Sequence, residues 1–191
     1  MKVIAFCGSA RKEGNTSLLL NAVLKPLAEA GAETELIELA SNEIRGCLGC
    51  YVCYLKKNRE CVLTKDLVNN SISKMAAADA ILLGSPTYFG DVSSEMKALI
   101  DRSSMVNKAN GYMFKRKPGA AVATAGRAGA VHTLDTMNHF FLLSQMIIVG
   151  SNDWNVGVGT EIGEVEDDEE GMKTMHQLGE NMSWLMKKLK T

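Results

Sequence analysis

The sequence lacks an excess of charge and any long hydrophobic run. Lysines and arginines number 21 against 22 aspartates and glutamates in 191 residues, which gives no support for binding to nucleic acid or to an anionic membrane. Apolar runs such as residues 76–83 are too short to span a bilayer, and the N-terminus starts a strand where a signal peptide would need a longer apolar region. We therefore expect a cytoplasmic protein with neither a nucleic-acid nor a membrane partner.

Histidine and cysteine are scarce over most of the chain. The three histidines lie apart in helical stretches and make no ligand set: His132, His139 and His176. Four of the five cysteines, however, fall within residues 47–61. In a reducing compartment, such a group favours a metal or redox role over structural disulfides.

Short apolar runs alternate with helical patterns along the chain. Strands are predicted at residues 2–7, 34–39, 80–84, 120–124 and 146–149. Helices are predicted at residues 16–31 (kinked or shortened by Pro26), 66–78, after Ser93, at 131–143 and from about 170 to 189. Because parallel strands need crossover connections, this order predicts an α/β fold with a doubly wound five-stranded parallel sheet in three layers.

The length suits one domain over residues 1–191. Two parts stand out from the alternating pattern: a cysteine-rich insertion at about residues 41–64, and a C-terminal loop and helix at about residues 150–190. The polar stretch 150–170 is unusually long for a connection, which suggests a lid or a subunit contact. We expect a homodimer or homotetramer.

The loop after the first predicted strand is rich in hydrogen-bond donors. Residues 8–17 read G-S-A-R-K-E-G-N-T-S and lead directly into a helix. Their hydroxyls, basic side chains and main-chain N–H groups at a helix start would bind an anion. The loop matches neither G-x-x-x-x-G-K-[ST] nor G-x-G-x-x-G, so a single phosphate monoester fits best. The alternative is an ordinary polar strand-to-helix turn.

Two more polar loops follow predicted strands. Residues 85–90 (S-P-T-Y-F-G) follow the third strand, and residues 124–129 (T-A-G-R-A-G) follow the fourth. Ligands of doubly wound sheets lie beyond the carboxyl ends of the strands, near the switch point. We therefore expect these loops and residues 8–17 to form one site.

The grouped cysteines have a regular spacing. Cys47, Cys50 and Cys53 are three residues apart, and Cys61 follows after seven intervening residues. A spacing of three residues places the first three sulfurs on one side of a turn, and the longer connection to Cys61 lets the fourth sulfur complete a tetrahedral set. A [4Fe–4S] cluster suits this set, although the last gap and the missing proline differ from the ferredoxin run. Zinc and unligated or redox-active thiols are the alternatives.

Taken together, the three loop motifs resemble those of the flavodoxin-like NAD(P)H-dependent FMN reductases. The motifs are G-S-A-R-K-E-G-N-T, S-P-T-Y-F-G-D-V-S-S-E-M-K-A-L-I-D-R and T-A-G-R-A-G, in that order, and the similarity extends to about residue 150. C-L-G-C-Y-V-C, followed by a further cysteine before K-D-L, is similar to the iron–sulfur flavoprotein branch. Ala10 stands where many relatives have proline, a mild departure.

The resemblance implies a flavodoxin-like fold that binds FMN. Carried over position by position, one set of residues would hold the ribityl phosphate: Ser9, Arg11, Asn15, Thr16 and Ser17. A second set would line the isoalloxazine: Pro86, Thr87, Tyr88, Phe89 and Gly90. A third would close its other edge: Thr124, Gly126 and Arg127. Tyr88 and Phe89 could instead cap the core at a strand end.

The resemblance also implies an FMN-dependent oxidoreductase. With NAD(P)H as co-substrate, it would reduce a small acceptor such as a quinone or a free flavin. Hydride transfer between stacked rings needs no protein acid or base, so we expect no catalytic side chain. The alternatives are an iron–sulfur flavoprotein that carries electrons with a ferredoxin-type partner, and a regulatory or scaffold domain without flavin.

Overall fold

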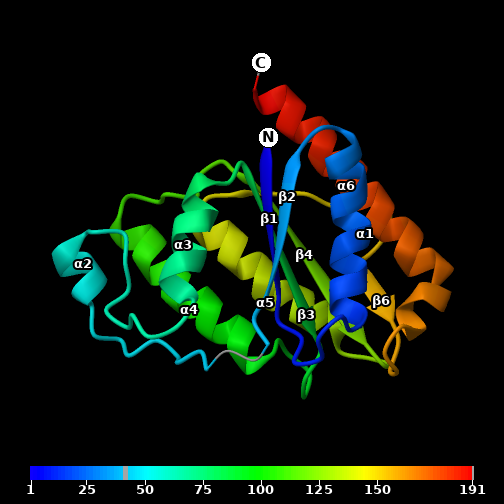
Figure 1. The fold of residues 1–191 in the computed structure, drawn as a ribbon, viewed down its shortest axis with the longest axis horizontal. Coiled ribbons are helices and arrows are strands. Elements are labelled where there is room, and N and C mark those ends of the chain that lie inside the picture. Colours follow the sequence, from blue (N-terminus) through cyan, green and yellow to red (C-terminus); the bar gives the residue numbers. More distant parts are fainter. Residues whose placement is uncertain (41–42, 191) are drawn as a thin grey trace.

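Parallel strands form the centre of the computed structural model, which describes residues 1–40 and 43–190. Five strands follow the order β2-β1-β3-β4-β5 (Figure 1). They are β1 (Lys2–Cys7), β2 (Glu33–Glu38), β3 (Ala80–Pro86), β4 (Pro118–Ala125) and β5 (Ile147–Ile148). All of these neighbours pair in parallel. The order in which the chain adds strands reverses between β1 and β3, which is therefore the switch point of a doubly wound sheet. The predicted five-stranded parallel sheet is confirmed.

A sixth strand departs from the prediction. β6 (Val156–Val158) pairs with β4 at residues 123–125, whereas β5 pairs with β4 at residues 118–119. The stretch expected as a loop at 150–170 therefore contains a strand, and a 3₁₀ turn, η1 (Glu164–Asp167), follows it. Gly157 permits this packing, because a Cβ there would lie 2.6 Å from side-chain atoms of both Leu19 and Val165. A run as short as Val-Gly-Val shows no usable periodicity.

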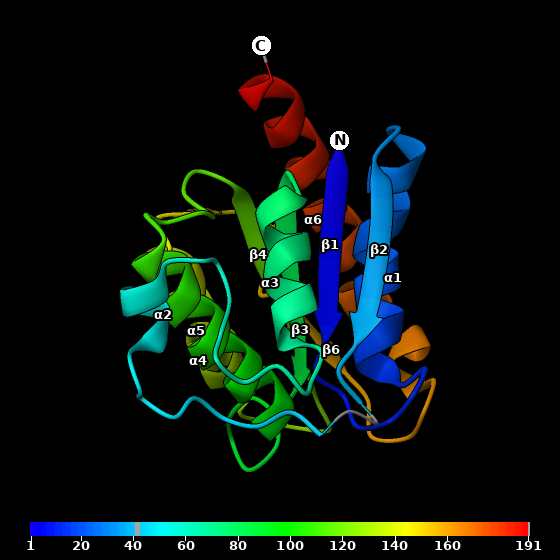
Figure 2. The ribbon, with the colours of Figure 1, turned by 60° about the vertical axis from the view of Figure 1, so that its left-hand side comes forward.

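Helices cover both faces of the sheet, as Figures 1 and 2 show. α1 (Asn15–Glu29) and α6 (Glu169–Leu189) lie on one face. α3 (Val68–Ala77), α4 (Ser94–Ala109) and α5 (Ala130–Leu143) lie on the other. A short further helix, α2 (Val52–Lys56), lies away from the sheet beside α4. The three-layer prediction is confirmed, and α2 was not predicted.

Alternate residues of the central strands enter different cores. In β1, Val3 and Ala5 pack under α1 and α6, whereas Ile4 and Phe6 pack under α3, α4 and α5. All four are completely buried. Burial on both faces explains why β1 and β3 read as unbroken apolar runs.

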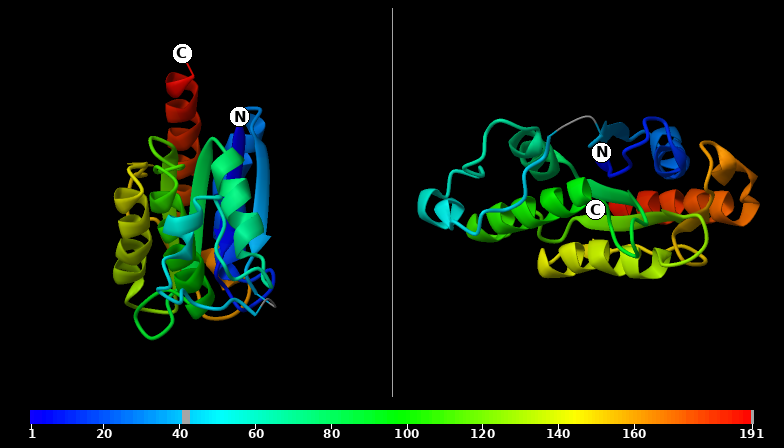
Figure 3. Two further views of the ribbon diagram at one scale, coloured as in Figure 1. Left: turned by 90° about the vertical axis from the view of Figure 1, so that its left-hand side faces the viewer. Right: turned by 90° about the horizontal axis from the view of Figure 1, so that it is seen from below.

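α6 lies along α1, and its last turns extend beyond the edge of the sheet where β1 begins (Figure 3). A Cβ at Gly179 would lie 2.3 Å from the Val23 carbonyl oxygen, so this crossing requires glycine. α1 continues through Pro26 to Glu29, and the proline therefore does not end the helix.

Among the described residues, no helix combines the length and apolarity needed to cross a membrane. Residues 41 and 42, where the cysteine-rich insertion was expected to begin, and residue 191 lie outside the described residues. The single domain and the homodimer or homotetramer stay predictions.

Candidate functional site

The loops at the carboxyl ends of β1, β3 and β4 meet around one open cavity of about 150 Å³. Hydrogen bonds join them directly. Thr16 and Thr124 share one between their hydroxyls at 2.8 Å, and the Thr87 N–H donates to the Thr124 carbonyl at 2.7 Å. The three loops expected to form one site are thus adjacent, for the topological reason given above.

The first loop turns around its own main chain before α1 begins. The Arg11 N–H donates to the Ser9 hydroxyl at 3.1 Å, and the Gly14 N–H donates to the Arg11 carbonyl at 3.2 Å. Gly14 is the residue before α1, and no side chain caps the helix there. The first N–H groups of a helix carry partial positive charge and need partners, so this end of the cavity attracts an anion.

Hydrogen bonds to neighbouring parts of the chain hold the first loop in place. Asn15 donates to the Glu161 carbonyl at 2.8 Å and accepts from the Gly163 N–H at 2.9 Å. On the other side, the Glu38 carboxylate accepts from the Ser17 hydroxyl at 2.8 Å and from the Glu13 N–H at 3.1 Å. The loop geometry is therefore fixed by contacts with residues 161 and 163, just before η1, and with β2.

The predicted site residues divide into those that line the cavity and those that do not. The lining residues among them are Ser9, Arg11, Asn15, Thr16, Pro86, Thr87, Tyr88, Thr124 and Gly126. Ser17 does not line the cavity, because its hydroxyl turns to Glu38. Phe89 and Gly90 form the tip of a tight turn closed by Tyr88 and Asp91, where the Phe89 side chain is fully exposed. Arg127 is exposed outside the lining.

Gly159 and Thr160, which follow β6, also line the cavity and were not predicted. The Arg11 guanidinium donates to the Thr160 carbonyl at 2.6 Å. A Cβ at Gly126 would lie 2.8 Å from the Thr160 hydroxyl oxygen, so glycine lets these two loops approach each other. The sequence signal for this contact is the pair of glycines at positions 157 and 159, because glycine within a strand often marks a close approach of another main chain.

The four grouped cysteines line a second, narrow cavity, whose other walls are mostly apolar. Cys53 lies on α2, which begins and ends at left-handed residues, Tyr51 (φ +56°) and Lys57 (φ +47°). Cys47 and Cys50 are exposed, whereas Cys53 and Cys61 are half-buried. The predicted ligand set is therefore gathered by tight turns against α4. In the described part of the chain, no three cysteine, histidine or acidic side chains are close enough together to hold a single metal ion.

Cys53 lies within electrostatic reach of Cys50 and Cys61. Burial raises the pKa of the Cys53 thiol, main-chain N–H groups lower it, and the charges of Cys50 and Cys61 raise it further. Cys7 is separate: it is buried in β1, and burial raises the pKa of its thiol. Cys7 is a core residue.

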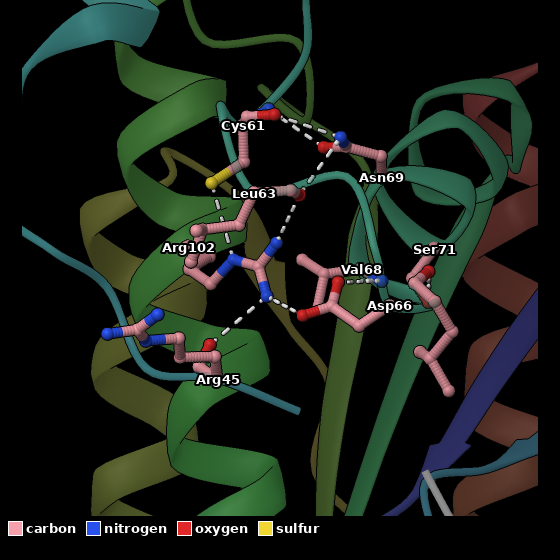
Figure 4. Close-up of polar contacts among 9 residues, drawn as sticks. Arg45, Cys61, Leu63, Asp66, Val68, Asn69, Ser71 and Arg102 are labelled. Carbon is pink, nitrogen blue, oxygen red and sulfur yellow. Dashed lines mark hydrogen bonds and ion pairs between the residues drawn. The ribbon is translucent and has the colours of Figure 1, made fainter. Parts of the chain in front are cut away.

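A buried ion pair joins α4 to the cysteine segment (Figure 4). The Asp66 carboxylate accepts from the Arg102 guanidinium, and both side chains are almost completely buried. Burial alone would raise the pKa of Asp66, but the hydrogen bond from Arg102 and the N–H of Val68 hold it below its ordinary value of 3.8. The ionised form of Asp66 is therefore more favourable in the folded protein than in the unfolded chain.

The pair should make stability depend on pH. Since the pKa of Asp66 is lowered by folding, its contribution is present above pH 3.8 and is lost as the pH falls through the folded value. At pH 7, Asp66→Asn should lower the free energy of unfolding by about 3 kcal/mol, because it leaves a buried guanidinium unpaired. The difference in unfolding free energy between the wild type and Asp66→Asn should become smaller below pH 3.8. Urea unfolding followed by tryptophan fluorescence measures it.

Asp101→Asn is the matched control. Asp101 pairs with Lys97 on the exposed side of α4, where such pairs contribute about 0.5 kcal/mol or less. Equal losses in the two variants would contradict a special role for the buried pair.

Comparison with known proteins identifies the family of this chain. The protein-family model described as NADPH-dependent FMN reductase matches residues 1–161. An iron–sulfur flavoprotein of Methanocaldococcus jannaschii is 40% identical over the full length of both chains. One from Methanosarcina thermophila is 30% identical over 95% of this chain and 93% of its own. The predicted resemblance, including its iron–sulfur flavoprotein branch, is confirmed.

Solved structures agree on the fold. A WrbA-like flavodoxin from Agrobacterium tumefaciens superposes with a TM-score of 0.66 and 16% identity, over 98% of this chain and 97% of its own. This likeness supports the flavodoxin-like arrangement of the sheet and helices. Sequence and fold together lead to one conclusion: the chain belongs to the NADPH-dependent FMN reductase family and is a flavin oxidoreductase.

Proposed function

We propose that the enzyme binds FMN in the cavity at the strand ends and uses it to pass electrons from NAD(P)H to a small acceptor such as a quinone or a free flavin. The observation that carries this proposal is the convergence of three separate polar loops on one open cavity. We infer that one domain, residues 1–191, carries this site and the cysteine cavity.

The first loop suits the phosphate end of FMN. It offers the uncapped start of α1, the Arg11 guanidinium and the hydroxyls of Ser9 and Thr16. Charge and main-chain donors together favour a phosphate dianion. Asn15 is held in place by residues 161 and 163, so ordering it costs little when the ligand binds. Ser17 supports the loop through Glu38.

The other two loops suit the ring of FMN. Pro86, Thr87 and Tyr88 line the cavity beside β3, and Thr124 and Gly126 line it beside β4. We assign the outer edge of the ring to the residues at the rim: Phe89, Gly90 and Arg127. When bound, FMN supplies hydride and electron transfer, and these residues orient the ring and exclude water. No carboxylate or imidazole is among the described residues that line the cavity, which suits a reaction without an acid or base.

Replacing Arg11 should weaken FMN binding through the phosphate alone. Arg11→Met removes one charged donor, so the Kd for FMN should rise about tenfold to a hundredfold. The Kd for riboflavin, which lacks the phosphate, should change little. Fluorescence titration of the flavin-free protein measures both, with Lys12→Met, a neighbouring exposed cation outside the cavity lining, as the matched control. Equal losses for FMN and riboflavin would place Arg11 away from the phosphate.

The electron donor can be tested on the yellow protein. Under anaerobic conditions and without an acceptor, NADH or NADPH should bleach the flavin absorbance at a rate that matches the turnover measured with a quinone. Stopped-flow absorbance measures the rates. Reduction by reduced ferredoxin but by neither nicotinamide would instead support an electron carrier.

The cysteine cavity favours a second component of the function, an iron–sulfur cluster. Cys47, Cys50, Cys53 and Cys61 supply four thiolates around one mostly apolar cavity, which is the ligand set of a [4Fe–4S] cluster. A bound cluster supplies single-electron transfer, and the apolar walls limit the access of water to its ligands. With a cluster, the enzyme could exchange single electrons with a ferredoxin-type partner, whereas the flavin handles pairs.

Anaerobic preparation decides whether the cluster is present. The protein should contain about four irons and four sulfides per chain, as judged by iron and sulfide analysis and EPR. Cys50→Ala should lose the iron and keep the FMN, because the two cavities are separate. Cys7→Ala, outside both cavities, should keep both. Protein prepared in this way without iron would rule out the cluster.

A further inference from the structure

Arg102 is the largest side chain that the described core buries completely. It lies on α4 with 1% of its surface exposed. A guanidinium is costly to bury unless its donors find partners. We therefore expect the buried guanidinium of Arg102 to have a role besides packing.

Among the described residues, the hydrogen-bond partners of the Arg102 side chain all lie in or next to the segment that carries the cysteines (Figure 4). Nε donates to the Cys61 sulfur at 3.3 Å, and Nη2 donates to the Leu63 carbonyl at 2.8 Å. Nη1 donates to the Arg45 carbonyl at 3.1 Å and to the Asp66 carboxylate. One side chain thus connects both ends of the cysteine segment, residues 45 and 61–66, to α4.

The main chain at Cys61 is held independently. The Cys61 N–H donates to the Asn69 side chain at 2.7 Å, and the Asn69 amide donates back to the Cys61 carbonyl at 2.9 Å (Figure 4). Asn69 therefore fixes where Cys61 lies, and Arg102 fixes the direction of its sulfur. Arg102 and Cys61 both line the cysteine cavity.

The same helix is also joined to the strand-end cavity. The Ser93 hydroxyl caps α4 by accepting from the Met96 N–H at 3.2 Å. The Ser93 N–H donates to the hydroxyl of Ser85, near the carboxyl end of β3, at 3.0 Å. α4 thus connects the carboxyl end of β3 to the cysteine cavity, which it lines with Arg102.

We propose that Arg102 is a positioning residue for the iron–sulfur cluster, which directs the Cys61 thiolate into the cysteine cavity and raises the reduction potential of the cluster held there. This role rests on the cluster proposed above. Reduction adds one electron to the cluster, and a positive charge with an N–H···S hydrogen bond stabilises the more negative reduced state. Asp66 opposes this effect, because its negative charge partly cancels that of Arg102.

Substitutions at the two charges should shift the cluster potential in opposite directions. Arg102→Met should move the midpoint potential of the cluster to more negative values, and Asp66→Asn should move it to more positive values. Arg102→Lys should recover part of the shift, since it keeps the charge and loses the planar fork. Anaerobic redox titration followed by EPR measures the cluster, and the flavin potential in the same samples should stay unchanged.

The rate of cluster loss gives a second measurement. Transfer of iron to a chelator should be about tenfold to a hundredfold faster in Arg102→Met than in the wild type, as for other partners of metal ligands. Lys108→Met, which removes an exposed cation from the same helix, is the matched control and should change neither the potential nor the rate.

A double variant guards against misfolding. Arg102→Met combined with Asp66→Asn leaves no unpaired buried charge, and its potential should still be more negative than that of Asp66→Asn alone. The role of Arg102 would be wrong if iron-loaded Arg102 variants kept the wild-type potential, or if Arg102→Met and Asp66→Asn shifted it in the same direction. Neither result would contradict the cluster itself. Wild-type protein without iron would overturn both.

Discussion

The parallel pairing of β1, β3 and β4 is the constraint on which the rest of the structure depends. It brings three loops that are distant in sequence to one edge of the sheet. Contact at that edge is close: the Gly8 N–H donates to the Gly84 carbonyl at 2.8 Å, and a Cβ at Gly8 would lie 2.8 Å from the Ser93 hydroxyl oxygen. Glycine at position 8 therefore lets α4 begin directly against the first loop, and the direction of α4 decides where the cysteine segment can pack.

The two cavities are built by different means. At the strand ends, loop main chains and short polar side chains form the walls, and neighbouring elements hold them through Asn15 and Glu38. The cysteine segment has no strand of its own and turns through left-handed residues such as Gly49 and Tyr51. Since it contributes few side chains to the core, it depends on specific polar contacts for its position.

The predictable parts of the molecule are those in which one local pattern determines the outcome. β1 and β3 are buried on both faces, so their apolar runs identify them, and the polar loops follow from the strand ends. β6 and α2 have too few residues to show a period, and β6 depends on pairing with β4. The outward direction of Phe89 depends on a turn conformation with two positive φ values, and the phenylalanine at its first position gives no local signal for it.

Arg102 shows a further limit of local patterns. On a helix, a basic side chain is usually solvated, and the sequence around residue 102 gives no sign of burial. Its partners are Cys61 and Asp66, which lie 41 and 36 residues away along the chain. The cluster proposed for this segment would bring negative charge from four thiolates, and a fixed buried cation would offset that charge where flexible lysines at the surface could not. The cost of burying Arg102 is offset by Asp66 and by two carbonyls, so the charge can remain beside Cys61 without access to water.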